Sequence, residues 1–162
     1  MELLHERERE FRLKRVLERL DRSYDFVIID CPPSLNILTV NALIAAHSVL
    51  IPLQCEYFAM EGLGELVRTL QLIKSRLNPG LEREGILLTM YDKRNRLSHQ
   101  VGDEVRRLFG VLVFETVIPR NVRLSECPSF GQPILQYDAR SAGAEAYVAL
   151  AQELIARRRS NP

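Results

Sequence analysis

Cysteine is scarce in this chain, and its three cysteines are widely separated. Cys31, Cys55 and Cys127 include no pair with C-x-x-C spacing, so the sequence predicts neither a zinc site nor a disulfide framework. Reduced thiols in a cytosolic protein are the expected state. The first residues are charged rather than apolar, so we expect no signal peptide and a cytoplasmic location.

Neither charge sign dominates, and no long apolar run is present. The chain carries 22 basic and 21 acidic side chains, which excludes a global positive field and leaves DNA binding to a local patch. The most apolar stretch, residues 42–53, is interrupted by His47, Ser48 and Pro52 and is too short to span a bilayer. We therefore expect no membrane role.

A glycine-rich phosphate loop is also missing. None of the eight glycines is followed by lysine, so these 162 residues lack the N–H cradle and lysine that hold a triphosphate in P-loop proteins. Yet residues 26–35, FVIIDCPPSL, place Asp30 directly after an apolar run. A carboxylate at the tip of a buried strand can hold a magnesium-bound water beside a triphosphate, the Walker B role. A solvated aspartate in an ordinary turn is the alternative.

Apolar periodicity predicts strands that alternate with helices. The predicted helices cover residues 3–21, 36–46, 63–77, 97–108 and 141–158, and the predicted strands cover residues 24–30, 48–53, 85–91 and 111–118. Ser34 is the expected cap of the second helix. This order predicts a single α/β domain over residues 1–162, with a parallel sheet covered by helices on both faces.

Ligands of such sheets bind beyond the carboxyl ends of the strands, so the loops there are the candidate site. After the third strand, residues 92–96 read DKRNR, which is either a phosphate-contacting patch or solvated charge. After the fourth, a loop over residues 119–137 opens with Pro119, Arg120 and Asn121, followed by Arg123. These residues could pack on a base or guide an anion, and a solvent-exposed turn is the alternative.

Two other helical features receive plainer interpretations. The charges of residues 3–21 are expected to form a solvated face without a function. The last helix carries an apolar stripe that includes Leu150 and Leu154, followed by three arginines. A membrane-binding helix is one reading of this pattern, but packing of the stripe on the sheet is the expectation.

Four blocks of the chain together resemble one family. They are residues 24–43 (YDFVIIDCPPSLNILTVNAL), 49–63 (VLIPLQCEYFAMEGL), 85–101 (GILLTMYDKRNRLSHQV) and 117–147 (VIPRNVRLSECPSFGQPILQYDARSAGAEAY). In this order they resemble the ParA/Soj ATPases of chromosome and plasmid partitioning. The resemblance implies a P-loop NTPase fold of the deviant Walker A, ParA/MinD type. It also implies binding of ATP with Mg²⁺, a nucleotide-sandwich homodimer, DNA binding without sequence preference, a ParB-type partner and association with the nucleoid.

The resemblance also assigns roles to individual residues. Asp30 matches the Walker B aspartate, which holds Mg²⁺ through water. The residues that match the nucleotide-binding positions are Met90, Pro119, Arg120 and Asn121. The residues that match basic positions at or near the DNA-binding surface are Arg94, Arg96 and Arg123.

One departure from the family limits what the resemblance implies. Members begin with a phosphate loop, K-G-G-x-G-K-[ST], which this chain lacks, so it resembles the C-terminal part of such a protein, with a fold incomplete at the N-terminus. We expect ATP hydrolysis to be lost in these 162 residues, and an exposed sheet edge to make them marginally stable or self-associating. The alternative is a non-catalytic paralogue that binds DNA or a ParA-like partner.

Overall fold

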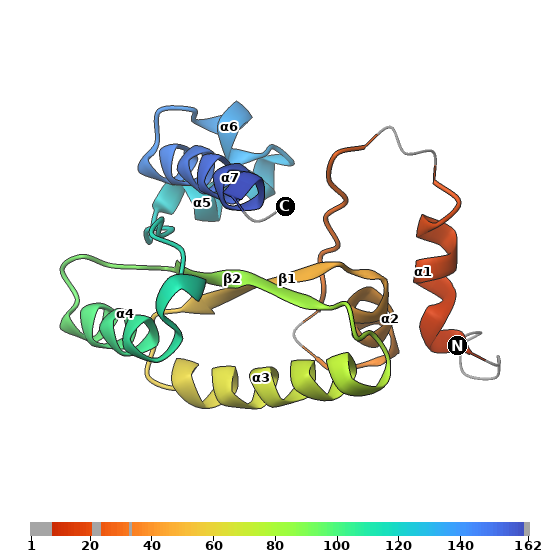
Figure 1. The fold of residues 1–162 in the computed structure, drawn as a ribbon. Helices are drawn as coiled ribbons and strands as arrows, with labels where there is room; N and C mark the ends of the chain where they lie inside the picture. The colour runs from red at the N-terminus through yellow and green to blue at the C-terminus, as the bar shows by residue number, and fades with distance from the viewer. Residues whose placement is uncertain (1–7, 21–23, 33, 161–162) are drawn as a thin grey trace. The chain divides into compact units, whose positions relative to one another are not determined.

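The computed structural model describes residues 8–20, 24–32 and 34–160, which divide between two compact units (Figure 1). One unit comprises Met1–Val49 and Glu65–Arg83, and the other Leu50–Gly64 and Glu84–Pro162. The elements are η2 (Arg9–Phe11), α1 (Arg12–Leu17), α2 (Ile37–Ala45), β1 (Ser48–Gln54), α3 (Ala59–Arg76), β2 (Glu82–Thr89), α4 (Arg96–Phe109), η3 (Gly110–Leu112), α5 (Val122–Glu126), η4 (Cys127–Phe130), α6 (Ile134–Tyr137) and α7 (Ala142–Ser160).

The sheet is built from β1 and β2, which are neighbours and parallel. At one end the amide of Glu82 donates to the carbonyl of His47 at 2.9 Å, and at the other the amide of Cys55 donates to Thr89 at 3.2 Å. Pairing therefore advances in the same direction along both strands. The predicted strands at 48–53 and 85–91 and the α/β class are confirmed.

The predicted strand at 111–118 is wrong as a regular strand, although its residues do follow β2. Isolated parallel bridges join Ile86 to Val113 and Tyr91 to Pro119. Residues 114–118, between the two bridges, are not part of a regular strand. The physical reason is competition for the backbone donors. The amides of Glu115 and Thr116 donate to the Glu153 carboxylate, both at 2.9 Å, so they are not available to β2.

The predicted strand at 24–30 is also wrong. Residues 25–32 have no strand conformation and run as a coil between α1 and α2 in Figure 1. Ile28 is 90% exposed, and Phe26 and Val27 are exposed as well. An apolar run becomes a strand only where a neighbouring backbone supplies hydrogen bonds, and among the described residues neither β1 nor β2 pairs with this segment.

The side chains of two asparagines, the buried Asn41 and the half-buried Asn78, organise the first unit. Asn41 of α2 accepts from the amide of Leu13 at 3.1 Å and donates to the carbonyl of Arg9 at 3.0 Å, which ties α1 to α2. Asn78 donates to the last carbonyls of α2, including that of Ala46 at 2.9 Å. The helix predicted at 3–21 is described only from residue 8 and is shorter, with residues 21–23 outside the described range.

The start of α2 differs from the prediction in its cap. Asn36, not Ser34, is the N-cap, and its side-chain oxygen accepts from the amides of Leu38 and Thr39 at 2.9 and 3.2 Å. The backbone carbonyl of Ser34 instead accepts a hydrogen bond from the Thr39 hydroxyl. Both residue types cap helices, and the backbone turn decides which one lies in reach.

The second unit is packed around Leu87, Phe114 and Ile118. Leu150 and Leu154 of α7 pack against this cluster, as predicted for the apolar stripe of the last helix. Gly85 allows the close approach, because a Cβ there would lie 2.6 Å from the Phe114 ring. Within the described ranges no helix is long and apolar enough to cross a membrane.

The segment predicted as a loop over residues 119–137 is mostly helical. It contains α5, η4 and α6, with Cys127 and Ile134 buried beside Ala144 of α7. Asn121 caps α5, and η4 ends at Gly131, which takes a left-handed φ of 63°. The predicted end of α4 at Gly110 is confirmed, again with a positive φ.

Candidate functional site

Two loops of the second unit meet at the carboxyl end of β2. We call this surface the β2 rim and define it as residues 90–96, residues 119–123 and Glu56. The amide of Tyr91 donates to the carbonyl of Ile118 at 3.1 Å, and the amide of Arg120 donates to the carbonyl of Tyr91 at 3.0 Å. The two loops expected at one edge of the sheet are therefore joined by backbone hydrogen bonds.

Met90 turns the chain out of β2 in an unusual backbone conformation. Its φ is 51°, whereas non-glycine residues usually have negative φ because their Cβ collides with the following carbonyl. Such residues cost about 1–3 kcal/mol and are found preferentially at functional sites. Met90 is half-buried, so only part of its side chain is accessible at the rim.

Arg120 and Asn121 are held by different kinds of contact. The Arg120 guanidinium lies 3.6 Å from the carboxylate of Glu56, which follows β1, and both side chains are more than half exposed. The Asn121 side-chain oxygen caps α5 by accepting from the amides of Arg123 and Leu124 at 2.8 and 3.3 Å. Asn121 thus shapes the loop, while Arg120 presents a charge on it.

The turn from Asp92 to Asn95 is closed by several local hydrogen bonds. The amide of Asn95 donates to the Asp92 carbonyl at 3.0 Å, and the amide of Arg94 donates to the Asp92 carboxylate at 2.9 Å. That backbone hydrogen bond, with the nearby Arg94 charge, lowers the pKa of Asp92 below its ordinary value. Asn95 then caps α4 by accepting from the amide of Leu97 at 2.9 Å.

A tyrosine and a histidine connect this turn to α4. The Tyr91 hydroxyl lies 2.9 Å from Nδ1 of His99, and Nε2 of His99 lies 2.8 Å from the carbonyl of Lys93. Burial raises the pKa of Tyr91, an effect that the nearby Arg106 partly offsets. Sequence reasoning assigned His99 no role, because no spacing motif links it to a backbone carbonyl six residues earlier.

The three arginines predicted to bind DNA differ in their surroundings. The Arg94 side chain is 93% exposed, and its guanidinium lies 3.5 Å from the Asp92 carboxylate. Arg96 is exposed in the first turn of α4. Arg123 instead pairs with Glu126 at 3.0 Å and Asp138 at 3.4 Å, and the Glu126 hydrogen bond raises its pKa. The structure therefore leaves Arg94 and Arg96 more accessible to an anion than Arg123.

Asp30 belongs to the first unit, in the irregular segment after α1. It is exposed, and the strand that should have carried it is absent from the described residues. The neighbouring Cys31 thiol has a raised pKa because of burial and the Asp30 charge. Within the described ranges, Asp30 does not lie at the end of a strand.

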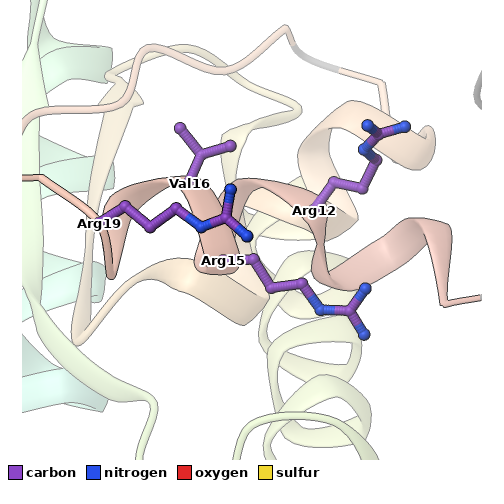
Figure 2. Close-up of a pocket in the computed structure, with 4 residues that line it drawn as sticks. All are labelled: Arg12, Arg15, Val16 and Arg19. Carbon is purple, nitrogen blue, oxygen red and sulfur yellow. The ribbon is translucent and has the colours of Figure 1, made fainter.

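A second basic surface lies on α1 of the same unit. Arg12, Arg15 and Arg19 surround Val16 along an open hollow of about 250 Å³, and their guanidinium groups point in different directions (Figure 2). Arg15 forms an ion pair with Glu8. This face matches the solvated charged helix that the sequence predicted.

The chain does not fit a complete site for ATP and Mg²⁺. The sequence contains no glycine followed by lysine, and the described residues contain no group of three or more His, Cys, Asp or Glu side chains that could hold a metal ion. Asp30, the expected Walker B residue, is exposed. No catalytic step is therefore assigned to these residues.

Comparison with known proteins identifies the family. A family of AAA domains matches residues 1–83. Chromosome partitioning protein ParA of Myxococcus xanthus is 59% identical over 97% of this chain, and sporulation initiation inhibitor protein Soj of Bacillus subtilis is 56% identical over 96%. The chain belongs to the ParA/Soj family of AAA domains. This ParA/Soj-family chain spans 56% and 62% of the length of those two relatives.

Solved structures agree on the fold of this ParA/Soj-family chain. Cobyrinic acid a,c-diamide synthase from Mycobacterium smegmatis matches with a TM-score of 0.80 and 38% identity, over 99% of this chain and 59% of that one. A structure of the same enzyme with a bound ATP analogue and magnesium matches with a TM-score of 0.68, over 75% of this chain and 50% of that one. Cell division ATPase MinD of Pyrococcus furiosus matches with a TM-score of 0.72 at 24% identity, over 90% of this chain and 57% of that one, which shows the fold alone. The fold is that of the P-loop ATPases of the ParA/MinD type.

Proposed function

We propose that this chain acts in partitioning a chromosome or plasmid, as a ParA/Soj-type protein that dimerises with ATP and binds DNA without sequence preference. The observation that carries the proposal is the identity of 59% to a chromosome partitioning protein over nearly the whole chain. We further propose that residues 1–162 alone do not hydrolyse ATP, because the phosphate loop is missing from them. A ParB-type partner and a cytoplasmic location at the nucleoid complete the proposal.

The part of the nucleotide that we propose this chain contacts is the base. Met90, Pro119, Arg120 and Asn121 supply the contact, and they lie together at the β2 rim through the backbone bonds of Tyr91. This arrangement supports a proposal for the base only, because the chain has no glycine followed by lysine and so lacks the phosphate loop. Asp30 keeps its proposed Walker B role only where a phosphate loop is present beside it.

The absence of hydrolysis is tested with purified residues 1–162. Phosphate release is measured with ATP and Mg²⁺ at saturating DNA, and the expected rate equals that of the Asp30→Asn variant, which is the matched control. Magnesium-dependent release above that control would refute this half of the proposal. Reading the coding sequence upstream of Met1 for K-G-G-x-G-K-[ST] tests whether a phosphate loop accompanies the chain.

DNA binding is tested by the anisotropy of labelled duplexes of two unrelated sequences across a range of salt. Equal affinities that fall steeply with salt are expected, with a slope of about 0.9 per phosphate contacted. Arg94→Gln and Arg96→Gln should each lower the slope by about 1, and Arg123→Gln should lower it less because Glu126 and Asp138 already hold that side chain. Arg107→Gln on α4, where Glu104 pairs the side chain, is the control.

A second candidate is a non-catalytic paralogue that binds DNA or a ParA-like chain. Two observations together favour this alternative: Arg94 is exposed, and the chain contains no phosphate loop. Both candidates predict salt-sensitive DNA binding. They differ in nucleotide dependence, because the first predicts dimerisation with ATP when a phosphate loop is supplied and the second predicts the same oligomeric state with and without ATP.

A further inference from the structure

We infer that Tyr91 and His99 are positioning residues that hold the turn of residues 92–95 in one conformation, so that Lys93 and Arg94 meet DNA phosphates already ordered. The inference rests on the proposed DNA binding and extends it to two side chains with no assigned role. The observation that carries it is a chain of contacts that runs from β2 through Tyr91 and His99 to the Lys93 carbonyl.

Tyr91 is the fixed end of this chain of contacts. Its backbone joins both loops of the rim, and its ring meets the His99 ring edge-on at a centroid distance of 5.4 Å. A Cβ at Gly102 of α4 would lie 3.4 Å from the Tyr91 ring, so the ring lies against the helix at a position without a side chain. The hydroxyl can therefore approach His99 from a ring held by β2 and α4.

His99 uses both ring nitrogens. With Nε2–H donating to the Lys93 carbonyl at 2.8 Å, Nδ1 is left to accept from the Tyr91 hydroxyl at 2.9 Å. The donation to Lys93 fixes the middle of a turn whose ends are already fixed by Asp92 and by the Asn95 cap. These hydrogen bonds join parts of the turn to one another and to α4.

The charged groups, by contrast, are directed outward. Lys93 and Arg94 are both exposed, and the backbone that carries them is bonded on either side. A turn ordered before binding loses less conformational freedom when it meets a ligand, so its cations bind phosphate more tightly than the same cations on a loose loop. Electrostatic contacts of this kind depend on salt, which gives the inference its measurement.

The test measures the salt slope of duplex DNA binding for His99→Ala, His99→Gln and Tyr91→Phe in the 162-residue chain. His99→Ala should lower the slope by about 1–2 and weaken binding at low salt. His99→Gln should restore most of the slope, since its amide can donate to the Lys93 carbonyl. Tyr91→Phe keeps the ring and removes only the hydroxyl, so a slope between those of the wild type and His99→Ala is expected. His47→Ala, at an exposed histidine of the other unit, is the matched control.

A double-mutant cycle separates positioning from a loss of fold. If His99 acts through the turn, His99→Ala should add little in a background that carries both Lys93→Gln and Arg94→Gln, whereas independent effects would add. Full additivity, or a His99→Ala slope equal to that of the wild type, would overturn the inference while leaving the DNA-binding proposal intact. A wild-type chain without salt-sensitive binding would overturn both.

Discussion

The segment of residues 24–32 and strand β2 with its rim have similar sequence patterns but differ in structure. Each combines a β-branched or apolar run with an acidic residue just beyond it, Asp30 in one and Asp92 in the other. Within β2, Leu88 is fully buried, and in the rim Asp92 is hydrogen-bonded within its turn. In the other segment, Ile28 is 90% exposed and Asp30 is exposed too.

The difference shows that a neighbouring backbone, rather than β-propensity, decides which apolar run becomes a strand. β2 has β1 on one side and residues 113–120 on the other, so its amides and carbonyls have partners. Residues 24–32 have no strand neighbour within the described part of the chain. Propensity measured in a sheet largely reports packing against such neighbours.

The largest expected effect is a loss of stability in the region packed around β2. Phe114→Ala removes a fully buried ring from the cluster of Leu87 and Ile118, and it should lower the free energy of unfolding by about 3–5 kcal/mol. Urea denaturation followed by circular dichroism measures the change. A loss below about 1 kcal/mol would show that this cluster is not packed as described.

A smaller effect is expected where residues 113–120 approach β2 most closely. A Cβ at Gly85 would lie 2.6 Å from the Phe114 ring and 2.7 Å from the Leu112 carbonyl oxygen. Gly85→Ala should therefore force a backbone shift and lower the free energy of unfolding by about 1–3 kcal/mol. Gly80→Ala, where the nearest atom is 3.7 Å away, is the control and should change stability little.

The third prediction concerns Glu153, whose carboxylate binds the amides of Glu115 and Thr116 and pairs with Arg157. Burial alone would raise the pKa of Glu153, but these hydrogen bonds bring it below the ordinary value of 4.5. A lowered folded-state pKa stabilises the fold above the unfolded-state pKa, and this stabilisation is lost as pH falls through the folded-state pKa.

Glu153→Gln should thus cost about 1–3 kcal/mol near neutral pH. The difference from the wild type should shrink as pH falls below the ordinary pKa of 4.5, and denaturation at a series of pH values measures it. A difference that stays constant with pH would mean that the charge on Glu153 is unimportant for the fold.

The smallest effect is expected in the exposed segment. Ile28→Ala should change the free energy of unfolding by less than about 0.5 kcal/mol, because the side chain is 90% exposed. Hydrogen exchange should likewise be faster for the amides of residues 25–32 than for those of residues 86–91. Slow exchange together with a loss above about 2 kcal/mol would mean that the segment forms a strand in solution.

Much of the fold was predictable because its signals are local. The start of α4 follows from the capping side chain of Asn95, and its end from Gly110, which adopts a positive φ. The strands at β1 and β2 follow from short apolar runs bounded by polar residues and turns. The broken pairing of residues 113–120 was not predictable, since Glu153 lies 37 and 38 residues away from the amides it binds.

The candidate site was predictable only in part. Sequence placed residues 92–96 and 119–123 at one edge of the sheet, and backbone bonds confirm that they meet. It could not find His99, whose partners are a hydroxyl and a backbone carbonyl. The sequence analysis also assigned DNA binding to Arg123 and Arg94 alike, whereas in the structure Arg123 forms ion pairs with Glu126 and Asp138.

The sequence by itself determined the family, the α/β class and the absence of a phosphate loop, because each depends on which residues occur and in what order. The tertiary structure alone decided which apolar run is a strand, which arginines are accessible, and that His99 contacts both the Tyr91 hydroxyl and the Lys93 carbonyl. Hydrogen bonds and ion pairs depend on the distances and directions between groups in space, and only folding sets those.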